Sequence, residues 1–345
     1  DIMPFDGVVS TVGESALLNA NGGAVAFYGT TRTVFAQENK YINRAFMRRV
    51  LSTVNGKPIT IGEAHRLAQN DVITGAAKEG ESDRTQNHLQ YSLLGDPALS
   101  LNFPTMKVVL DSINGIACER TDTMPKLKAG SIARIAGHIE GKTDYQGVVT
   151  ATVRDSKELI TCKLNNTKEA DKAFQFYDRQ KTLYQGSDSV SNGKFSFSFA
   201  VPKDINYSDA TGLLNLYSIS NDKTMRAHGT SEKFTVGGSV ESRNDSIGPS
   251  IYCYLNSPSF VDGGDVNTTP FFVAKLSDRD GINAAGSGIG HDLQLVIDGD
   301  MTKTYNLNDY FTYDFGTYTS GSTYYSIPEL APGKHQLTFR AWDIQ

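Results

Sequence analysis

The chain has little cysteine, no run of basic residues and no long hydrophobic stretch. Its 345 residues include three cysteines, an odd and widely spaced set that excludes a disulfide framework and allows one bridge at most. The longest apolar run, Gly22–Gly29, is far shorter than the roughly 18 residues that a membrane-spanning helix needs. The net charge is −5, and Lys and Arg form no cluster. The sequence therefore excludes a transmembrane segment in this chain and argues against nucleic acid as a partner.

Familiar catalytic and metal-binding motifs are also missing. Nucleophile-elbow, phosphate-binding and dinucleotide-binding patterns do not occur. The six histidines are scattered, with no pair at metal-ligand spacing, and we expect structural or surface roles for most of them. Cys118, Cys162 and Cys253 lie in strand-like stretches with no histidine nearby, so we expect three small buried apolar side chains. The residues alone supply no complete catalytic set.

Helix signals are confined to the first part of the chain. Thr11–Glu14 and Thr60–Glu63 both have the form of a capping box, in which a hydroxyl and a carboxylate bind the free amides at a helix start. Apolar residues at helical spacing then predict one helix between the boxes and one after the second box. These residues are Ile42, Phe46, Val50 and Val54 for the former, and Ile61, Ala64, Leu67, Ala68 and Val72 for the latter.

Two short apolar runs predict strands beside these helices. Residues 21–31, in which Gly22 and Gly23 come before an apolar run, are predicted to form a strand covered on both faces, and residues 89–96 form a second such run. Alternation of strand, helix and strand predicts an α/β layered domain with a parallel or mixed sheet.

After Pro104 the signals are those of strands. Short alternating runs are separated by turn clusters, which is typical of antiparallel β-sandwiches. Phe195, Phe197 and Phe199 fall on one face of such a strand, and the serines between them fall on the other. This region is too long for one sandwich of roughly 100 residues, and Thr235–Pro249 has the composition of a joint. The sequence therefore predicts two sandwiches in tandem.

The most polar and glycine-rich loop is Ser277–Asp292. Asp278, Asp280 and Asn283 could offer oxygen ligands to calcium, but the spacing lacks the third acidic position and the closing Glu of a calcium loop. We therefore expect a connection between strands, with calcium as the alternative. No other cofactor or metal is expected.

Several stretches together resemble the gingipain-type cysteine peptidases, which have a caspase-like fold. Leu17–Phe35, Ile61–Gln69 and above all the "YSLLGDPALSLNFP" of Tyr91–Pro104 are similar to the latter half of that catalytic domain. Downstream stretches, among them Phe176–Gly212 and His335–Gln345, resemble one branch of the family, the sortases (C-terminal signal peptidases) of the type IX secretion system. A series of matches in the same order is more specific than any one of them.

The resemblance implies a multidomain chain, α/β followed by all-β. Residues 1–103 are expected to form the C-terminal half of the caspase-like peptidase domain. Residues 104–238 are expected to form an Ig-like β-sandwich, and residues 239–345 a second one that is truncated at its C-terminus. A partial α/β sheet has an open strand edge, so we expect a partner chain, a swapped segment or residues outside this chain to cover it.

The resemblance also implies a function. In the family the nucleophilic cysteine is followed by a Phe-Asp segment, which Phe5 and Asp6 match, so we expect that cysteine immediately before Asp1 and the catalytic histidine further upstream. Without this nucleophile and base the chain should be inactive alone. The parent is expected to be a secreted cysteine endopeptidase that removes C-terminal sorting domains from cargo and attaches the cargo to anionic lipopolysaccharide. The alternative is a non-catalytic cell-surface binding or spacer module of tandem β-sandwiches.

One loop is implied to contact substrate. In the gingipain fold, the loop after the strand that follows the nucleophile borders the specificity pocket, and here it is Thr30–Phe35. Thr30, Thr31 and Arg32 are the expected substrate-binding residues, and the alternative is an ordinary strand-to-helix loop. The implied partners are protein cargo, lipopolysaccharide and outer-membrane proteins. The implied location is the secreted or outer-membrane surface of a Gram-negative bacterium.

Overall fold

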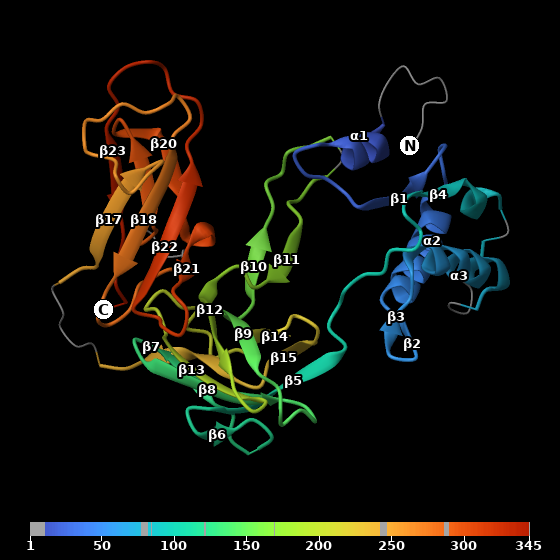
Figure 1. Ribbon diagram of the computed structural model, residues 1–345, viewed down its shortest axis with the longest axis horizontal. Coiled ribbons are helices and arrows are strands. Elements are labelled where there is room, and N and C mark those ends of the chain that lie inside the picture. The colour runs from blue at the N-terminus through green and yellow to red at the C-terminus, as the bar shows by residue number, and fades with distance from the viewer. Residues whose placement is uncertain are drawn as a thin grey trace. The chain divides into compact units, whose positions relative to one another are not determined.

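The computed structural model describes residues 11–76, 82–83, 85–120, 122–168, 170–241, 247–285 and 290–344. The chain divides into two compact units, Asp1–Thr105 and Met106–Gln345. The first unit is mixed α/β and the second is built almost entirely of strands, as the sequence predicts (Figure 1). None of the described helices combines the length and the apolar character that crossing a bilayer requires.

The first unit contains a helical pair and a strand pair. Its elements are α1 (Val12–Leu18), β1 (Ala26–Thr30), α2 (Ala36–Val50), β2 (Thr53–Val54), β3 (Lys57–Pro58), α3 (Ile61–Thr74), the 3₁₀ turn η1 (Asn87–Gln90) and β4 (Tyr91–Gly95). The core between α2 and α3 is made by fully buried small and branched side chains: Ile42, Ala45, Ala68 and Val72. The periodicity of both helices is thereby confirmed. The exception is Val54, which lies beyond the end of α2 in β2 and is 60% exposed.

Both predicted helix starts are confirmed, the second with only half of its capping box. At α1 the box is reciprocal, because the Thr11 hydroxyl accepts from the Glu14 amide (3.3 Å) and the Glu14 carboxylate accepts from the Thr11 amide (2.9 Å). At α3 the Thr60 hydroxyl accepts from the Glu63 amide (3.2 Å). The Glu63 carboxylate binds the Arg66 guanidinium instead, one turn further on. A nearby cation thus competes with the backbone amide for this carboxylate.

The strand pair β1 and β4 is antiparallel, so the described strands of this unit do not form the parallel sheet that was one of the two expectations. A mixed sheet, the other expectation, stays a prediction. The register runs from Ala26 opposite Gly95 to Thr30 opposite Tyr91. Two helices connect the strands, and they pack against each other as a hairpin. Since the second helix reverses the direction of the first, the chain re-enters the sheet running opposite to β1. All five residues of β1 are half-buried, so this strand is not fully covered on both faces.

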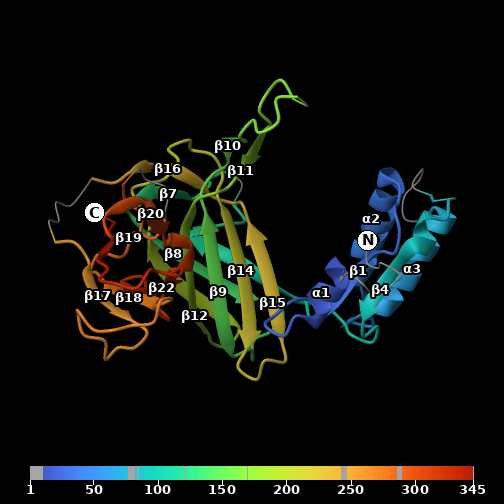
Figure 2. The same cartoon turned by 90° about the horizontal axis from the view of Figure 1, so that it is seen from above.

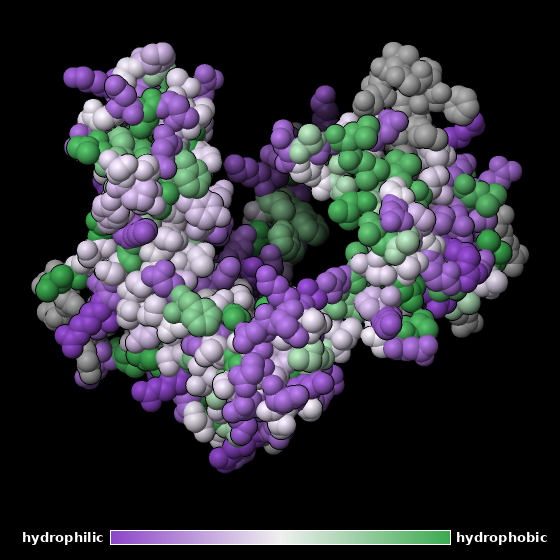
Figure 3. Space-filling view, viewed as in Figure 1, coloured by the Kyte–Doolittle hydropathy of each residue, from purple (hydrophilic) through white to green (hydrophobic). Residues whose placement is uncertain are grey.

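Apolar side chains of this unit remain exposed. Val12, Leu18 and Val25 are 72%, 81% and 78% exposed, and Figure 3 shows hydrophobic side chains gathered beside α1. Within the described residues, β1 and β4 pair only with each other, so each has one open edge. What covers these edges stays a prediction.

The second unit begins with an eight-stranded sheet and two smaller strand pairs. Its first strands are β5 (Met106–Ile113), β6 (Ile116–Ala117), β7 (Lys126–Ala129), β8 (Ile132–Ile139), β9 (Gly147–Arg154), β10 (Glu158–Thr161), β11 (Gln175–Asp178), β12 (Thr182–Val190), β13 (Lys194–Ala200), β14 (Leu213–Ser220), β15 (Arg226–Ser231) and β16 (Thr235–Ser239). The order in the large sheet is β12-β9-β14-β15-β5-β8-β13, with β6 paired to β5. Figure 2 shows β12, β9, β14 and β15 side by side. All neighbours are antiparallel except β15 and β5.

The strand-face pattern of β13 is confirmed. Phe195, Phe197 and Phe199 are buried, whereas Ser196 is exposed and Ser198 half-buried. The two end strands β12 and β13 follow each other in sequence, joined by a tight turn at Asn192 and Gly193. Positive φ angles of 52° and 71° at these residues are those of a type I′ hairpin turn.

The remaining strands form two further sheets. They are β17 (Ser250–Leu255), β18 (Phe271–Ser277), β19 (Gln294–Ile297), β20 (Asp300–Asn306), β21 (Thr312–Tyr313), β22 (Ser320–Ser326) and β23 (Leu337–Arg340), with a 3₁₀ turn η2 at Asn308–Tyr310. The sheet orders are β17-β18-β22-β21 and β20-β19-β23. Their buried residues share one hydrophobic cluster with the eight-stranded sheet. Tyr184 of β12, for example, stacks on Phe199 and on Tyr313, with ring centroids 4.8 and 5.2 Å apart. A domain boundary near residue 239 stays a prediction.

Two of the three cysteines differ from expectation. Cys118 is buried, but Cys162 and Cys253 are exposed, and all three are free thiols. Cys162 follows β10, whose only partner in the described part of the chain is β11, and Cys253 lies on the edge strand β17. Strand-like sequence alone does not show whether a second layer covers the strand.

Two Asn-Gly turns of the second unit provide a matched test of backbone strain. Gly115 and Gly193 have nearly equal φ angles of 77° and 71°. A methyl group at Gly115 would meet nothing within 4 Å, whereas at Gly193 it would overlap the Lys142 carbonyl oxygen. We expect Gly115→Ala to cost about 1 kcal/mol of unfolding free energy, from left-handed strain alone. Gly193→Ala should cost about 2 kcal/mol or more, because strain and overlap add. Denaturant unfolding followed by fluorescence of the single Trp measures both, and equal losses would contradict the overlap.

Candidate functional site

The loop Thr30–Phe35 is held at its start by β4. Thr30 is the last residue of β1 and lies opposite Tyr91. The next residue, Thr31, donates to the Gln90 carbonyl twice, from its amide (2.9 Å) and from its hydroxyl (3.2 Å). The loop therefore leaves the sheet in a fixed direction.

Asn87 holds the other end of the loop. Its side-chain oxygen accepts from the Phe35 amide (2.7 Å), and its side-chain amide donates to Asn39 Oδ1 on the first turn of α2 (3.2 Å). Phe35 is the N-cap residue of α2 and has no side chain that can cap a helix. Asn87 is only 2% exposed, so a distant residue supplies a buried polar group at this helix start.

Asp83 organises the segment that carries Asn87 and Gln90. One carboxylate oxygen accepts from the amide (2.8 Å) and hydroxyl (2.6 Å) of Thr85, and the other from the amide (2.9 Å) of His88 and its Nδ1 (3.1 Å). Burial by itself would raise the pKa of Asp83, but these hydrogen bonds together outweigh burial and lower it. The ionised carboxylate is thus the form that shapes the segment.

A pocket of about 480 Å³ lies beside β1, the loop and the first turns of α2. Of the predicted substrate residues, Thr30 lines it, whereas Thr31 and Arg32 do not. Arg32 is exposed and has no hydrogen-bond or ion-pair partner in the described part of the chain. Lys40 is the only cationic side chain of the lining, which consists of Phe27, Tyr28, Gly29, Thr30, Val34, Ala36, Asn39, Lys40, Asn43 and Tyr91. Such a lining suits an organic ligand with apolar and hydrogen-bonding groups.

Aromatic rings support the sheet side of the pocket. Tyr28 stacks on Phe46 with ring centroids 4.1 Å apart, and it contacts Tyr91 and the edge of His65 at 5.2 and 5.3 Å. Burial raises the pKa of Tyr28, and burial lowers the pKa of His65. The Tyr28 hydroxyl and His65 Nδ1 are buried without a hydrogen-bond partner among the described residues. Both groups are therefore held neutral at pH 7.

The described residues provide no thiol that a histidine could activate. Burial raises the pKa of the Cys118 thiol, which keeps it protonated. Neither Cys162 nor Cys253 is hydrogen-bonded to a histidine in the described ranges. Phe5 and Asp6, which carry the expected match next to a nucleophile, lie outside the described residues.

The three calcium candidates take part in hydrogen bonds with other residues of the protein. Asp278 Oδ1 accepts from the amides of Asp280 (2.7 Å) and Gly281 (3.2 Å). Asn283 is buried, its side-chain oxygen accepts from the Ala285 amide (3.2 Å), and its side-chain amide donates to Asp204 (3.2 Å). The described ranges, which omit residues 286–289 of this loop, bring together no three His, Cys, Asp or Glu residues that could hold a metal ion. Calcium at these residues stays a prediction.

Sequence reasoning missed Asn87 and Asp83. Asp83, Thr85 and Asn87 alternate in a polar stretch, a pattern typical of turns in which side chains bind nearby amides. That pattern could have predicted the local bonds. The bond from Asn87 to Phe35 spans 52 positions and has no signal in one sequence.

Comparisons with known proteins connect the first unit to a peptidase family. Residues 2–102 match the model of Peptidase family C25. Among solved structures, the chain is similar to one described as dimeric latent PorU from Porphyromonas gingivalis, at 32% identity over 92% of this chain and 30% of that chain, with a TM-score of 0.45. The chain thus spans less than a third of that protein's length. A red sea bream transglutaminase is 10% identical over 68% of this chain and 29% of that chain, with a TM-score of 0.22.

Both TM-scores are too low for either likeness to bear on the fold. The comparison with curated proteins gave no significant match.

Removing the Asn87 side chain should loosen the loop. Asn87→Ala leaves the Phe35 amide without its acceptor, which we expect to cost about 1–3 kcal/mol of local stability. Amide hydrogen exchange at Phe35 and Thr31 should accelerate accordingly. Asn43→Ala is the control, because Asn43 lines the same pocket and its side chain is exposed. Unchanged exchange at Phe35 in the Asn87 variant would refute the capping role.

His65 should make the first unit less stable in mild acid. Unfolded histidine takes up a proton near its ordinary pKa of 6.5, but the folded pKa of His65 is lower. Stability should therefore be full above pH 6.5 and decline as the pH falls from 6.5 to the folded value. His65→Phe should flatten this decline in hydrogen exchange of α3. His228→Gln, a change at an exposed histidine, should leave it unaltered. A decline that persists in His65→Phe would assign it to another group.

Proposed function

Because residues 2–102 are part of a domain of peptidase family C25, the gingipain family, we propose that the chain forms part of a secreted cysteine endopeptidase. The C25 match is the observation that carries this proposal. The motifs of the downstream region resemble the type IX secretion sortases, which supports a location at the outer-membrane surface of a Gram-negative bacterium. Its substrates would be secreted cargo proteins with C-terminal sorting domains, and its acceptor an anionic lipopolysaccharide.

Within this proposal the chain supplies one wall of the substrate pocket. The loop Thr30–Phe35 is fixed at both ends by partly buried hydrogen bonds, which suits a wall that must keep its shape when a peptide binds. Thr30 and Lys40 offer hydrogen bonds, and Phe27 and Val34 offer apolar contact. Thr31 holds the wall in place, and Arg32 is an exposed residue beside it in the same loop.

The nucleophile and its base come from outside residues 1–345 in this proposal. Peptide cleavage by such an enzyme requires a thiolate that attacks the carbonyl, a histidine that accepts and returns the proton, and donors that stabilise the oxyanion. No thiol of the described residues has a histidine partner. The acyl-enzyme would pass to an amine instead of water where the closed site limits water access.

The second unit would hold the peptidase domain at the cell surface. We propose Ig-like sandwiches at residues 104–238 and 239–345 as its parts. A second candidate function, a binding or spacer module, is favoured by the hairpin β10–β11 (Figure 1). Leu159, Phe174 and Tyr177 on this hairpin are 50%, 69% and 68% exposed, and such exposed apolar groups are typical of contact surfaces.

Kinetics of the longer protein that contains this chain test the proposal. Replacing Thr30, Thr31 and Arg32 together by alanine should lower kcat/KM for peptide substrates by about tenfold or more, because the pocket loses the Thr30 side chain and the loop loses the Thr31 hydroxyl bond that anchors it. Thr33→Ala is the matched control, since Thr33 is an exposed residue of the same loop outside the pocket lining. Unchanged kinetics in the triple variant would refute the pocket role.

The isolated 345-residue chain provides the second arm of this experiment. It should cleave no peptide substrate, because it lacks an activated thiol. If this chain cleaves a peptide and a thiol reagent blocks the cleavage, the nucleophile lies within residues 1–345. That result would overturn the proposal that the nucleophile and its base lie outside them. A longer protein without a cysteine before Asp1 and an upstream histidine would favour the binding module.

A further inference from the structure

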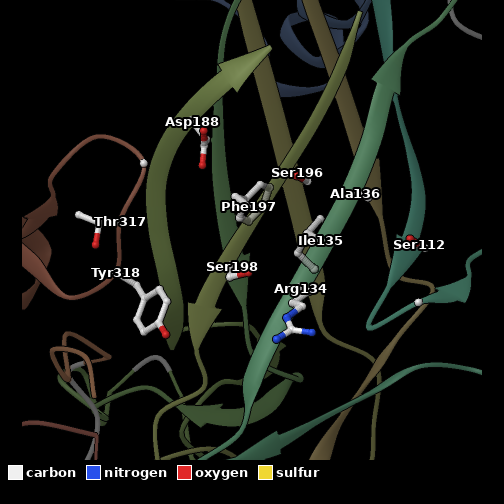
Figure 4. A pocket seen from close by; sticks show the side chains of 12 residues that line it. Ser112, Arg134, Ile135, Ala136, Asp188, Ser196, Phe197, Ser198, Thr317 and Tyr318 are labelled. Carbon is white, nitrogen blue, oxygen red and sulfur yellow. The ribbon is translucent and has the colours of Figure 1, made fainter. Parts of the chain in front are cut away.

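A trough of about 460 Å³ lies on the second unit, over the outer face of β5, β8 and β13 (Figure 4). Its floor is made of small side chains in cross-strand register. Ser112 lies opposite Ala136, and Ala136 lies opposite Ser196. In the neighbouring row Arg134 lies opposite Ser198. The small residues leave a cavity above the sheet, and three of them, Ser112, Ser196 and Ser198, line this cavity with hydroxyl-bearing side chains.

Arg134 is the one long cationic side chain of the trough. The turn after β5 fixes its backbone, because the Arg134 amide donates to Asn114 Oδ1 (2.8 Å) and the Asn114 amide donates to the Arg134 carbonyl (2.8 Å). The side chain is exposed, and no residue of the described ranges forms a hydrogen bond or ion pair with its guanidinium. A cation on a rigid strand without a partner is available to a ligand.

The opposite wall comes from the turn between β21 and β22. The Gly316 amide donates to the Ser187 carbonyl of β12 (2.9 Å), which fixes the turn against the large sheet. Asp314 closes the turn by accepting from the Ser320 hydroxyl (2.6 Å). Thr317 and the ring of Tyr318 thereby line the trough. In the view of Figure 4, Arg134 and Tyr318 lie toward one end and Asp188 toward the other.

We propose that this trough is a binding site for a hydroxylated monocarboxylate, the chemical class to which sugar acids belong. The guanidinium of Arg134 binds the ligand carboxylate through two parallel, charge-assisted hydrogen bonds. The hydroxyls of Ser196 and Ser198 exchange hydrogen bonds with ligand hydroxyls, and the ring of Tyr318 covers an apolar ring face. The inference does not rest on peptidase activity.

The charges of the trough favour one negative group. Arg134 is its only cation, and Asp188 lines the same space. One oxygen of Asp188 accepts from the Ser189 amide (2.6 Å), and no partner of the other oxygen lies in the described ranges. A second anionic group on the ligand would meet this carboxylate and be repelled, whereas a hydroxyl could donate to it. A monocarboxylate therefore fits better than a phosphate dianion.

Binding of three matched ring compounds tests the site. Glucuronate carries a carboxylate and hydroxyls, glucose carries hydroxyls only, and cyclohexanecarboxylate carries a carboxylate only. Titration calorimetry and ligand-observed NMR with the full chain should show glucuronate binding about tenfold or more tightly than either of the others, because only glucuronate uses both the guanidinium and the serines.

Two variants locate the binding. Arg134→Ala should weaken glucuronate binding by about tenfold or more, and Ser198→Ala by a smaller factor. Arg340→Ala, which removes an exposed arginine outside the trough, should change nothing. Circular dichroism confirms that each variant is folded. Absence of glucuronate binding, equal binding of all three compounds, or unchanged binding by Arg134→Ala would each overturn the proposal.

Discussion

Backbone groups that neither a helix nor a strand can satisfy determine the shape of the candidate pocket. The chain between β1 and α2 must place its amides against some acceptor, because buried free amides are costly. Gln90 and Asn87 provide those acceptors, and the ionised Asp83 holds both residues in place. The pocket wall therefore depends on a segment that lies more than 50 positions away in the chain. The geometry of this wall is set by the hydrogen bond between Asn87 and the Phe35 amide more than by the sequence of the loop.

Secondary structure that depends on neighbouring residues could be predicted from the sequence, whereas the pairing of strands that are distant in the chain could not. Capping residues predicted the starts of α1 and α3, and helical spacing predicted α2 and α3. Alternation predicted the buried phenylalanines of β13. The antiparallel pairing of β1 with β4 depends on how two helices reverse the chain, which no local pattern records. Of the predicted pocket residues, Thr30 lines the pocket and Arg32 does not, because family resemblance locates a loop but not the direction of each side chain.

The second unit shows how small residues create space on a sheet. Alternation puts Ile135 of β8 and the phenylalanines of β13 inward, which leaves Ala136, Ser196 and Ser198 beside Arg134 on the outer face. The turn that carries Tyr318 then closes one side of this face, since it is bonded to β12. Neither stretch alone predicts a trough, because its two walls come from strands that are far apart in sequence and meet only in the folded unit.

The parallel contact between β15 and β5 has a consequence for how this region folds. It joins Ala227 to Met106 and is the step that links the two halves of the eight-stranded sheet. Hairpins such as β14–β15 or β12–β13 close short loops, whereas this contact joins strands that are more than a hundred residues apart in the chain. The loss of chain entropy on forming the β15–β5 contact then limits the assembly of the sheet. Partly assembled sheets with unpaired strand edges are the species most prone to aggregation.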